Sequence, residues 1–400
     1  MKKIAIVCGH FMPEIGYQET YLARAFRRLG YEVQVFTTNE ISPTGRKIIK
    51  EKYTAGITTD EKYGYKIQRL ESTAYFNSKV VSTGLRDAIN KFHPDYAIII
   101  ALAKLFPVPI LSENFNGLKK IAMFGDADEY VNRTTTTRKI KSFFKEVVGS
   151  GLKKHLYTKA VKQCHRIVLN IPETEQFFKN LLSKDANKIF EKKKLPLNLG
   201  YDPDNFFFDE SERAVIRKQL KVKDDECMII TSTRVNRQKH LEKIIENISH
   251  LKAKGLKVHY VIIGFLSDDY EKELKKFISE QKHPEIFHCF GFMNHDEIRK
   301  FFNASDVGLW IKAAISIQES MGTGLCVVLE NKESVNHLLT EGENGFYFEK
   351  NKIEETLQKA VEKYFSIAPD KKNENRKKLA EKNSVRFSYN TIAKKIIEGL

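Results

Sequence analysis

Short apolar runs alternate with amphipathic stretches along the whole chain, and this alternation predicts strands followed by helices. Near the start, the apolar run "KIAIVCGH" is followed by the amphipathic "TYLARAFRRLG" and then by the strand-like "YEVQVFTT". Strand, helix and strand in regular order are typical of parallel sheets, because each parallel pair needs a crossover connection. The first half of the chain therefore predicts an open α/β sheet covered by helices.

The second half restarts the same rhythm at "CMIITSTR". Helices are expected from Lys239 to about Lys254 and from Asp268 to Gln281, before the strand-like runs "LCVVLE" and "GFYF". Between the halves, "KLPLNLGYDPDNFF" is punctuated by glycine and proline, as is typical of a hinge. We predict four parts: a doubly wound domain over 1–197, a hinge over 198–222, a second doubly wound domain over 223–370, and a terminal helix over 371–400 that packs back on the first domain.

Length and cysteine usage agree with two intracellular domains. A chain of 400 residues exceeds what one core usually serves. The five cysteines are scattered without the CxxC spacing of a metal cluster, which indicates a reducing cytosol. The first residues lack the long apolar core of a signal peptide, and Lys104, Pro107 and Pro109 interrupt the most apolar window. We expect a cytoplasmic chain that does not span a membrane and binds no metal.

The positive charge is concentrated in the first half. Residues 1–200 carry 34 Lys and Arg against 19 Asp and Glu, whereas residues 201–400 carry 33 against 32. Residues 131–200 alone hold 16 basic and 5 acidic side chains, and phenylalanines and valines lie among the lysines. Such a segment suits an anionic membrane surface or a phosphate-bearing partner, although a solvated basic helix explains it equally well.

The stretch "SIQESMGTG" predicts a short helix that begins at Ser316, a capping-type residue, and ends at Gly322 and Gly324. Amides at a helix N-terminus suit phosphates, and a carboxylate one turn in can accept hydrogen bonds from sugar hydroxyls. Glu319 is that carboxylate, unless it only complements the helix dipole. Two doubly wound domains place such groups at one cleft.

The first turns of the two halves, "GHFMPEIGYQET" and "STRVNRQKHLEK", both lack the GxGxxG fingerprint of dinucleotide-binding proteins. This absence argues against a dehydrogenase. The charge is accompanied neither by an aromatic-basic platform of the kind on which bases stack nor by a groove-entering motif, which argues against nucleic-acid binding.

Five ordered motifs resemble those of the retaining GT-B glycosyltransferases of family four, and the resemblance runs over essentially the whole chain. The family signature of the first domain corresponds to "FMPEIGYQETYLARAFRRLGYEV", and the family hinge corresponds to "LPLNLGYDPDNFF". The donor motif, the later Gly-Phe turn and the Glu-containing helix correspond to "TSTRVNRQKHLEKII", "CFGFMNHDEI" and "IQESMGTGLCVV". The resemblance implies a GT-B fold, in which two Rossmann-like doubly wound domains face a central cleft.

The resemblance also implies roles for single residues. Arg234 and Lys239 would clamp the diphosphate of a nucleotide-sugar donor, unless they are surface cations at a strand-to-helix turn. Glu319 would accept the ribose hydroxyls. The other implied donor contacts are the amides of Ser316, Ile317 and Gln318, together with Gly16 and the neighbouring Tyr17 of the first domain. An ordinary turn glycine would also explain Gly16.

Two positions depart from the family pattern. Ile311 stands where members of the family commonly carry a first glutamate, which contacts the transferred sugar. The family often supplies a histidine at a strand end of the first domain, whereas "IAMFGDADEY" offers Asp126 and Asp128. We select Asp126 as the catalytic candidate, with a helix-capping role as the simpler interpretation.

The function implied by the resemblance is a metal-independent, retaining transfer of a hexose from a UDP- or GDP-sugar, without a cofactor. The acceptor would be a glycan or a lipid-linked glycan of a bacterial surface polysaccharide, made at the inner face of the plasma membrane. The Ile311 departure leaves a non-catalytic partner that only binds nucleotide sugar as an alternative. An epimerase or a phosphorylase of the same fold is another.

Overall fold

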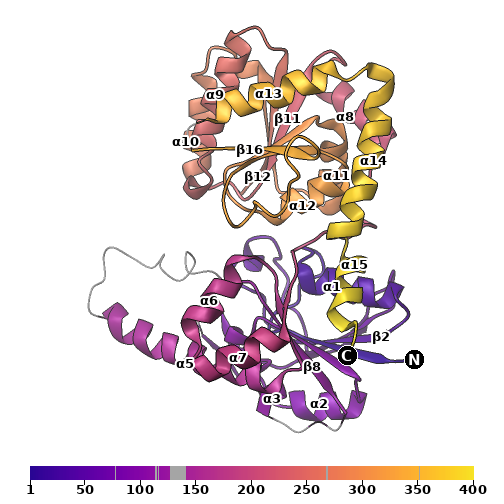
Figure 1. Ribbon diagram of the computed structural model, residues 1–400, viewed down its shortest axis with the longest axis vertical. Helices are drawn as coiled ribbons and strands as arrows, with labels where there is room; N and C mark the ends of the chain where they lie inside the picture. Colours follow the sequence, from indigo (N-terminus) through magenta and orange to yellow (C-terminus); the bar gives the residue numbers. More distant parts are fainter. Residues whose placement is uncertain (77, 113–114, 116, 127–140, 267–268, 351) are drawn as a thin grey trace. The chain divides into compact units, whose positions relative to one another are not determined.

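A computed structural model of the chain describes residues 1–76, 78–112, 115, 117–126, 141–266, 269–350 and 352–400, with the backbone alone for residues 141–150. The chain divides into two compact units, residues 1–199 with 389–400 and residues 200–388. Each unit is an open, mostly parallel sheet with helices packed against it (Figure 1). The doubly wound α/β class expected from the sequence is confirmed for both units.

The first unit is built on an eight-stranded sheet in the order β10-β9-β8-β7-β1-β2-β4-β3. Its central strand β1 (Lys3–Val7) has four consecutive buried residues, as expected for a parallel strand that is covered on both faces. The other strands are β2 (Glu32–Thr38), β3 (Gly56–Thr59), β4 (Lys66–Leu70), β7 (Tyr96–Ile100), β8 (Lys119–Phe124), β9 (Arg166–Leu169) and β10 (Lys194–Pro196), with a separate hairpin of β5 (Ala74–Phe76) and β6 (Lys79–Val81). Only β3 is antiparallel to its neighbour in this sheet.

The helices of the first unit connect successive strands. They are α1 (Gln18–Arg28), α2 (Leu85–Phe92), α3 (Val108–Ser112), α5 (Lys141–Gln163), α6 (Glu173–Leu181), α7 (Lys184–Lys193) and the terminal α15 (Tyr389–Ile397). The last of these packs against α1 although more than 300 residues separate them in the sequence (Figure 1).

The second unit has a six-stranded sheet in the order β13-β12-β11-β14-β15-β16, and all its pairs are parallel. The strands are β11 (Cys227–Ser232), β12 (Val258–Phe265), β13 (Phe287–Gly291), β14 (Val307–Trp310), β15 (Cys326–Glu330) and β16 (Gly345–Phe348). The helices are α8 (Glu210–Leu220), α9 (Leu241–Ala253), α10 (Asp269–Ser279), α11 (His295–Ala304), α12 (Ile315–Gly322), α13 (Ile353–Ser366) and α14 (Pro369–Phe387).

The borders of the units differ from the predicted ones at both ends of the second unit. The predicted hinge over 198–222 contains α8, which packs against α11 inside the second unit. The predicted terminal helix over 371–400 is divided, because α14 packs against α12 and only the residues from Tyr389 onward belong to the first unit. The chain therefore leaves the second unit at Ser388.

A buried ion-pair cluster anchors the amino edge of the second sheet. The carboxylate of Asp306, one residue before β14, contacts Arg213 at 2.7 Å and Arg217 at 3.0 Å, and it accepts the backbone N–H of Met228 at 2.8 Å. Arg213 also donates to the carbonyl of Ala304 at 2.9 Å. Burial by itself would raise the pKa of Asp306, but the two guanidinium groups outweigh burial and hold this pKa below its usual range.

No helix within the described part of the chain is both long enough and apolar enough to cross a membrane. The sequence led to the same expectation for the apolar window that Lys104, Pro107 and Pro109 interrupt.

We predict that Asp306→Asn destabilises the second unit by about 3–5 kcal/mol at pH 7, because it leaves the buried Arg217 and the partly buried Arg213 without their carboxylate. Trp310 is the only tryptophan of the chain and lies buried in the second unit. Its fluorescence in increasing urea therefore follows the unfolding of that unit. A depressed carboxyl pKa stabilises the fold above the unfolded value of about 3.9 and loses this contribution as the pH falls further. The difference between the wild type and the variant should therefore shrink below about pH 4.

Asp225→Asn is the matched control, because Asp225 forms an exposed pair with Lys257. It should leave the urea midpoint close to the wild-type value, because exposed ion pairs contribute little to stability. If the two variants unfold at the same urea concentration, the Asp306 cluster does not anchor the sheet.

Candidate functional site

The order of the strands in the second unit reverses between β11 and β14. The chain continues from β11 through α9 to β12 on one side, and from β14 through α12 to β15 on the other. Ligands of open α/β sheets bind outside the carboxyl ends of the strands at such a point. Arg234 follows β11 by two residues and Ile311 follows β14 directly, so both lie at this edge.

Helix α12 begins at the same edge, with Ala314 as its N-cap. The N–H of Ile317 donates to the carbonyl of Ala314 at 3.2 Å, and Gln318 is the fourth helical residue, whose N–H faces that same carbonyl in an α-helix. The amides left without a carbonyl acceptor in the helix are therefore those of Ile315 and Ser316. This corrects the predicted set of Ser316, Ile317 and Gln318, of which only Ser316 remains.

The side chain of Ser316 does not cap the helix as its position in the sequence suggested. Its hydroxyl donates to the carbonyl of Ser232, the last residue of β11. The indole N–H of Trp310, the last residue of β14, donates to the same carbonyl at 2.9 Å. One carbonyl oxygen therefore joins the ends of two strands to the start of α12.

The two polar residues that follow in α12 are also buried, with exposed fractions of 6% for Gln318 and 5% for Glu319. With its amide nitrogen placed as the hydrogen bonds require, Gln318 donates to the carbonyls of Ala314 and Ile315, both at 3.2 Å. Glu319 is the fifth residue of the helix and therefore lies in its second turn, not in the first turn as predicted. A complement to the helix dipole, which is strongest in the first turn, is a poor explanation for this buried carboxylate.

Lys239 lies close to the start of α12. It ends a short 3₁₀ turn (Arg237–Lys239), which the side chain of Asn236 caps by accepting the N–H of Gln238 at 3.0 Å. The ammonium of Lys239 donates to the carbonyl of Ala313 at 3.2 Å. The structure thus brings together Lys239 and the amides of α12, which are about 75 residues apart in the sequence.

Arg234 is exposed on the loop after β11, and its guanidinium has no hydrogen-bond or ion-pair partner within the described ranges. The backbone of this loop is fixed by Gly264, near the end of β12: the N–H of Val235 donates to the carbonyl of Gly264 at 3.1 Å. Gly264 has a φ of +121°, and a Cβ there would lie 2.0 Å from the carbonyl oxygen of Thr233. Only glycine fits, and sequence analysis missed this residue although a glycine inside a strand often marks a close backbone approach.

Ile311 is buried and lines a cavity of about 630 Å³ at the carboxyl ends of β14, β15 and β16. Lys312 and His240 line the same cavity, and burial followed by the charge of Lys312 lowers the pKa of His240. Position 311, where the family described above commonly has a glutamate, is therefore apolar in this chain and has basic neighbours.

Gly16 and Tyr17 lie in the first unit, where they precede α1. Gly16 has a φ of +70° and its N–H donates to the carbonyl of Met12 at 3.3 Å, so the loop uses the left-handed conformation that glycine favours. Tyr17 is the N-cap residue of α1. The side chain of the next residue, Gln18, accepts a hydrogen bond at 2.8 Å from Asn170, which follows β9.

Asp126 lies after β8 in the first unit, and both of its oxygens are engaged. Lys153 contacts one oxygen at 2.6 Å, and the hydroxyl of Tyr157 donates to the other at 2.6 Å. Both partners belong to α5, so the carboxylate fixes this helix to the end of the strand. Residues 127–140, which include Asp128, lie outside the described residues, so the helix-capping interpretation of Asp126 stays a prediction.

His10 is a further residue of the first unit that sequence analysis did not select. It follows β1, which lies beside β7 where the strand order of this sheet reverses. Its ring packs edge-on against the ring of Tyr75, with centroids 6.0 Å apart, and among the described residues its buried Nε2 has no hydrogen-bond partner. Burial and the charge of Lys104 lower its pKa to about 4. The sequence can reveal a histidine at the end of a predicted strand, but it cannot reveal that the ring nitrogen is buried.

The sequence of the second unit matches a known family. Residues 212–384 match the sequence model of the family described as "Glycosyl transferases group 1". No curated protein matches the chain in a sequence search.

Solved structures match the fold over almost the whole chain. Sucrose-phosphate synthase from Thermosynechococcus elongatus is 14% identical with a TM-score of 0.69, and the match covers 98% of this chain and 96% of the other. Anabaena HepE, solved with UDP and glucose, is 16% identical with a TM-score of 0.69 over 100% and 99% of the two chains. WaaG, a glycosyltransferase involved in lipopolysaccharide biosynthesis, is 13% identical with a TM-score of 0.64 over 99% and 100%.

We predict that Gly264→Ala displaces the loop that carries Arg234, because the added methyl group would overlap the carbonyl of Thr233. The expected loss of stability is at least about 2 kcal/mol, since the change combines a backbone conformation rarely adopted by alanine with a steric overlap. Urea unfolding followed by the fluorescence of Trp310 measures this loss.

Gly291→Ala, at the end of the neighbouring β13, is the control, because its added Cβ would lie 3.6 Å from the nearest atom, an ordinary contact. This variant should stay within about 1 kcal/mol of the wild type. If both variants are equally stable, the conformation of the loop that carries Arg234 does not depend on Gly264.

Proposed function

We propose that this chain transfers a hexose from a UDP- or GDP-sugar to a glycan acceptor with retention of configuration, a proposal supported by the match of residues 212–384 to the model of the group 1 glycosyl transferases. The observation that carries the proposal is the arrangement at the carboxyl edge of the second sheet. There the amides of Ile315 and Ser316 open α12, and Lys239 contacts the carbonyl of Ala313 just before it. The presence of UDP in the HepE structure of the same fold supports a nucleotide-sugar donor.

The chemistry of the donor explains why this arrangement suits it. When the bond between the sugar and the diphosphate breaks, negative charge develops on the departing phosphate. Fixed N–H groups and cations stabilise that charge without reorganising, which is the main way in which such sites lower the barrier. In this proposal the amides of α12 bind the diphosphate, and Lys239 and Arg234 supply positive charge that does not depend on a metal ion.

Glu319 has the second role in donor binding. Its carboxylate is buried five residues into α12, so it lies farther from the phosphate-facing amides than a first-turn residue would. A buried carboxylate that accepts hydrogen bonds from the two ribose hydroxyls would select a nucleoside diphosphate over free pyrophosphate.

The first unit would provide the acceptor side. In this proposal Gly16 and Tyr17 approach the donor through the loop before α1. Asp126 acts through Lys153 and Tyr157, which occupy its two oxygens, and not as a free base. His10, buried after β1, joins them as a candidate for contact with the sugar.

The acceptor proposed is a lipid-linked glycan of a bacterial surface polysaccharide at the cytoplasmic face of the membrane. The excess of basic residues over 131–200 supports contact with an anionic surface. Residues 131–140 of this segment lie outside the described part of the chain.

Ile311 favours one alternative, a non-catalytic partner that binds nucleotide sugar without turnover. An aliphatic side chain in place of the first glutamate removes a hydrogen-bond acceptor for the sugar, and basic residues outnumber the two glutamates, Glu246 and Glu330, in the lining of the cavity beside it. Such a partner would bind UDP and release no sugar with any acceptor. An epimerase or a phosphorylase of the same fold would instead change the donor without an acceptor glycan, which analysis of the products detects.

The proposal is tested with UDP-glucose, UDP-galactose and GDP-mannose, by calorimetric binding and by chromatography of the released nucleoside diphosphate. We predict that Lys239→Ala and Arg234→Ala each lower turnover at least about tenfold, an increase in barrier of about 1.4 kcal/mol, because each removes a charge that meets the departing phosphate. Melting temperatures should stay near the wild-type value, since both side chains reach solvent.

Lys254→Ala is the matched control, because this lysine lies just after the far end of α9 and pairs with Glu354 on the surface. It should keep the wild-type rate. If Lys239→Ala and Arg234→Ala both keep the wild-type turnover, these two cations do not stabilise the departing phosphate. A complete loss of activity on adding EDTA would contradict their proposed role as well. A wild-type chain that binds no nucleotide sugar would refute the function.

A further inference from the structure

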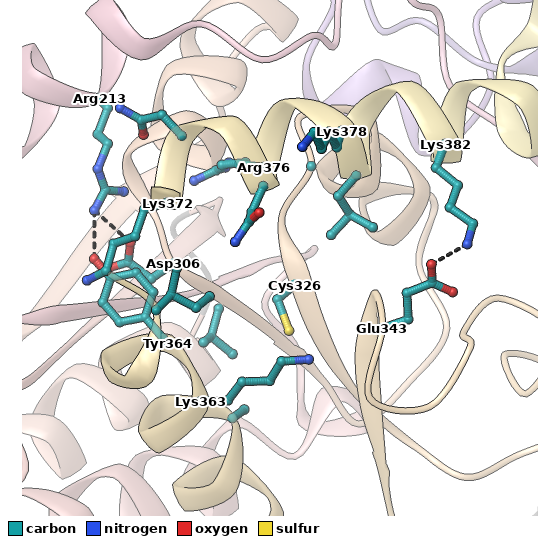
Figure 2. A pocket seen from close by; sticks show the side chains of 17 residues that line it. Arg213, Asp306, Cys326, Glu343, Lys363, Tyr364, Lys372, Arg376, Lys378 and Lys382 are labelled. Atoms are coloured by element: carbon teal, nitrogen blue, oxygen red, sulfur yellow. Dashed lines mark hydrogen bonds and ion pairs between the residues drawn. The ribbon is translucent and has the colours of Figure 1, made fainter. Parts of the chain in front are cut away.

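A second cavity lies at the opposite, amino edge of the second sheet, away from the candidate donor site. It has a volume of about 340 Å³ and lies between α13, α14 and the first residues of β14 and β15 (Figure 2). A cavity of this size suits a small organic ligand. It shares no lining residue with the candidate donor site, so donor binding does not account for it.

The cavity carries an excess of positive charge. Its two acidic residues already have basic partners, because Asp306 contacts Arg213 and Glu343 contacts Lys382. Figure 2 shows these pairs as dashed lines; of the other basic side chains, Lys363 donates to the carbonyl of Gly342 and Lys378 pairs with Glu374. The basic residues that line the cavity are Arg213, Lys363, Lys372, Arg376, Lys378 and Lys382.

Lys372 is the cation best placed to receive a ligand. Its ammonium lies 3.7 Å from the centre of the Tyr364 ring, and across the described ranges it has no carboxylate or carbonyl partner. Burial lowers the pKa of Lys372, because a partly desolvated ammonium is less stable without a counter-ion. A negatively charged ligand would supply the counter-ion that this ammonium group lacks.

The remaining walls of the cavity are apolar or neutral. Val307, Ala360, Ile367 and Leu379 contribute aliphatic surface, and Tyr364 contributes the face of its ring. The cavity therefore combines a cation with apolar walls beside it, which is suited to a carboxylate or phosphate that carries a small apolar body.

The cavity is also connected to α12. Arg376 lines it and donates from Nε to the carbonyl of Thr323 at 2.9 Å, and Thr323 is the C-cap of α12. A Cβ on Gly324 would lie 2.1 Å from the carbonyl oxygen of Arg376, so the two segments are in close contact. Since α12 has eight residues and is about 12 Å long, its other end lies at the candidate donor site.

We propose that this cavity binds a small organic anion with an apolar body and that its occupancy, transmitted through Arg376 and α12, changes the affinity of the donor site. The second part rests on the proposed function, whereas the first does not. The coupling is a linkage between two sites that share one short helix, so it acts equally in both directions.

The binding part is tested on the full chain with phenyl phosphate and benzoate as probes. Two reduced probes serve as controls: inorganic phosphate, which lacks the apolar body, and benzyl alcohol, which lacks the charge. We expect phenyl phosphate or benzoate to bind more tightly than either reduced probe. Lys372→Gln should weaken that binding at least about tenfold, because it removes a charged partner of the anion. The neighbouring Lys371→Gln, which is exposed and does not line the cavity, should leave it unchanged.

Absence of binding by both organic anions, or an equal affinity in the Lys372→Gln and Lys371→Gln variants, would overturn the site. Binding that disappears in Lys239→Ala would place the probe at the donor site and would overturn it as well. For the coupling, UDP affinity should change at least about threefold when the probe is saturating, and should not change in Lys372→Gln. An unchanged UDP affinity in the wild type would refute the coupling, whereas a wild type that does not bind UDP would refute the proposed function and leave the probe test valid.

Discussion

The carbonyl oxygen of Ser232 is the point on which the candidate donor site depends. It accepts the indole N–H of Trp310 and the hydroxyl of Ser316, so a single acceptor fixes the ends of two neighbouring strands and the start of α12. A helix of eight residues is too short to be stable in isolation. Its position must therefore come from tertiary contacts, and this carbonyl supplies the contact nearest to the amides of Ile315 and Ser316.

The C-terminal end of α12 is also fixed by tertiary contacts. Arg376 donates to the carbonyl of Thr323, and the side chain of Asn383 donates to that of Met321 at 2.8 Å. Gly322 packs against the ring of Tyr201, where a Cβ would lie 2.6 Å from the nearest ring atom. Because both ends are fixed, the N-terminal amides are held in place before any ligand binds. Such preorganisation is what stabilisation of a departing phosphate requires.

The alternation of apolar and amphipathic segments was sufficient to predict two doubly wound units, because central strands such as β1 and β7 are continuous apolar runs. The motif around Glu319 located α12 to within one residue of its start. Assigning its phosphate-facing amides required the hydrogen bond from Ile317 to Ala314, which the sequence does not reveal. The engagement of Asp126 by two residues of α5 and the close approach of Gly264 to Thr233 also depend on contacts between distant segments.

In the proposed function, the start of α12 receives the diphosphate of a nucleotide donor. The most direct measurement is the change in the backbone amide NMR signals when UDP is added to the full chain carrying labelled isoleucine and serine. We expect the signals of Ile315 and Ser316 to shift most among the labelled residues, since their N–H groups would become hydrogen-bond donors to phosphate. Saturable UDP binding that leaves both signals unchanged would contradict it.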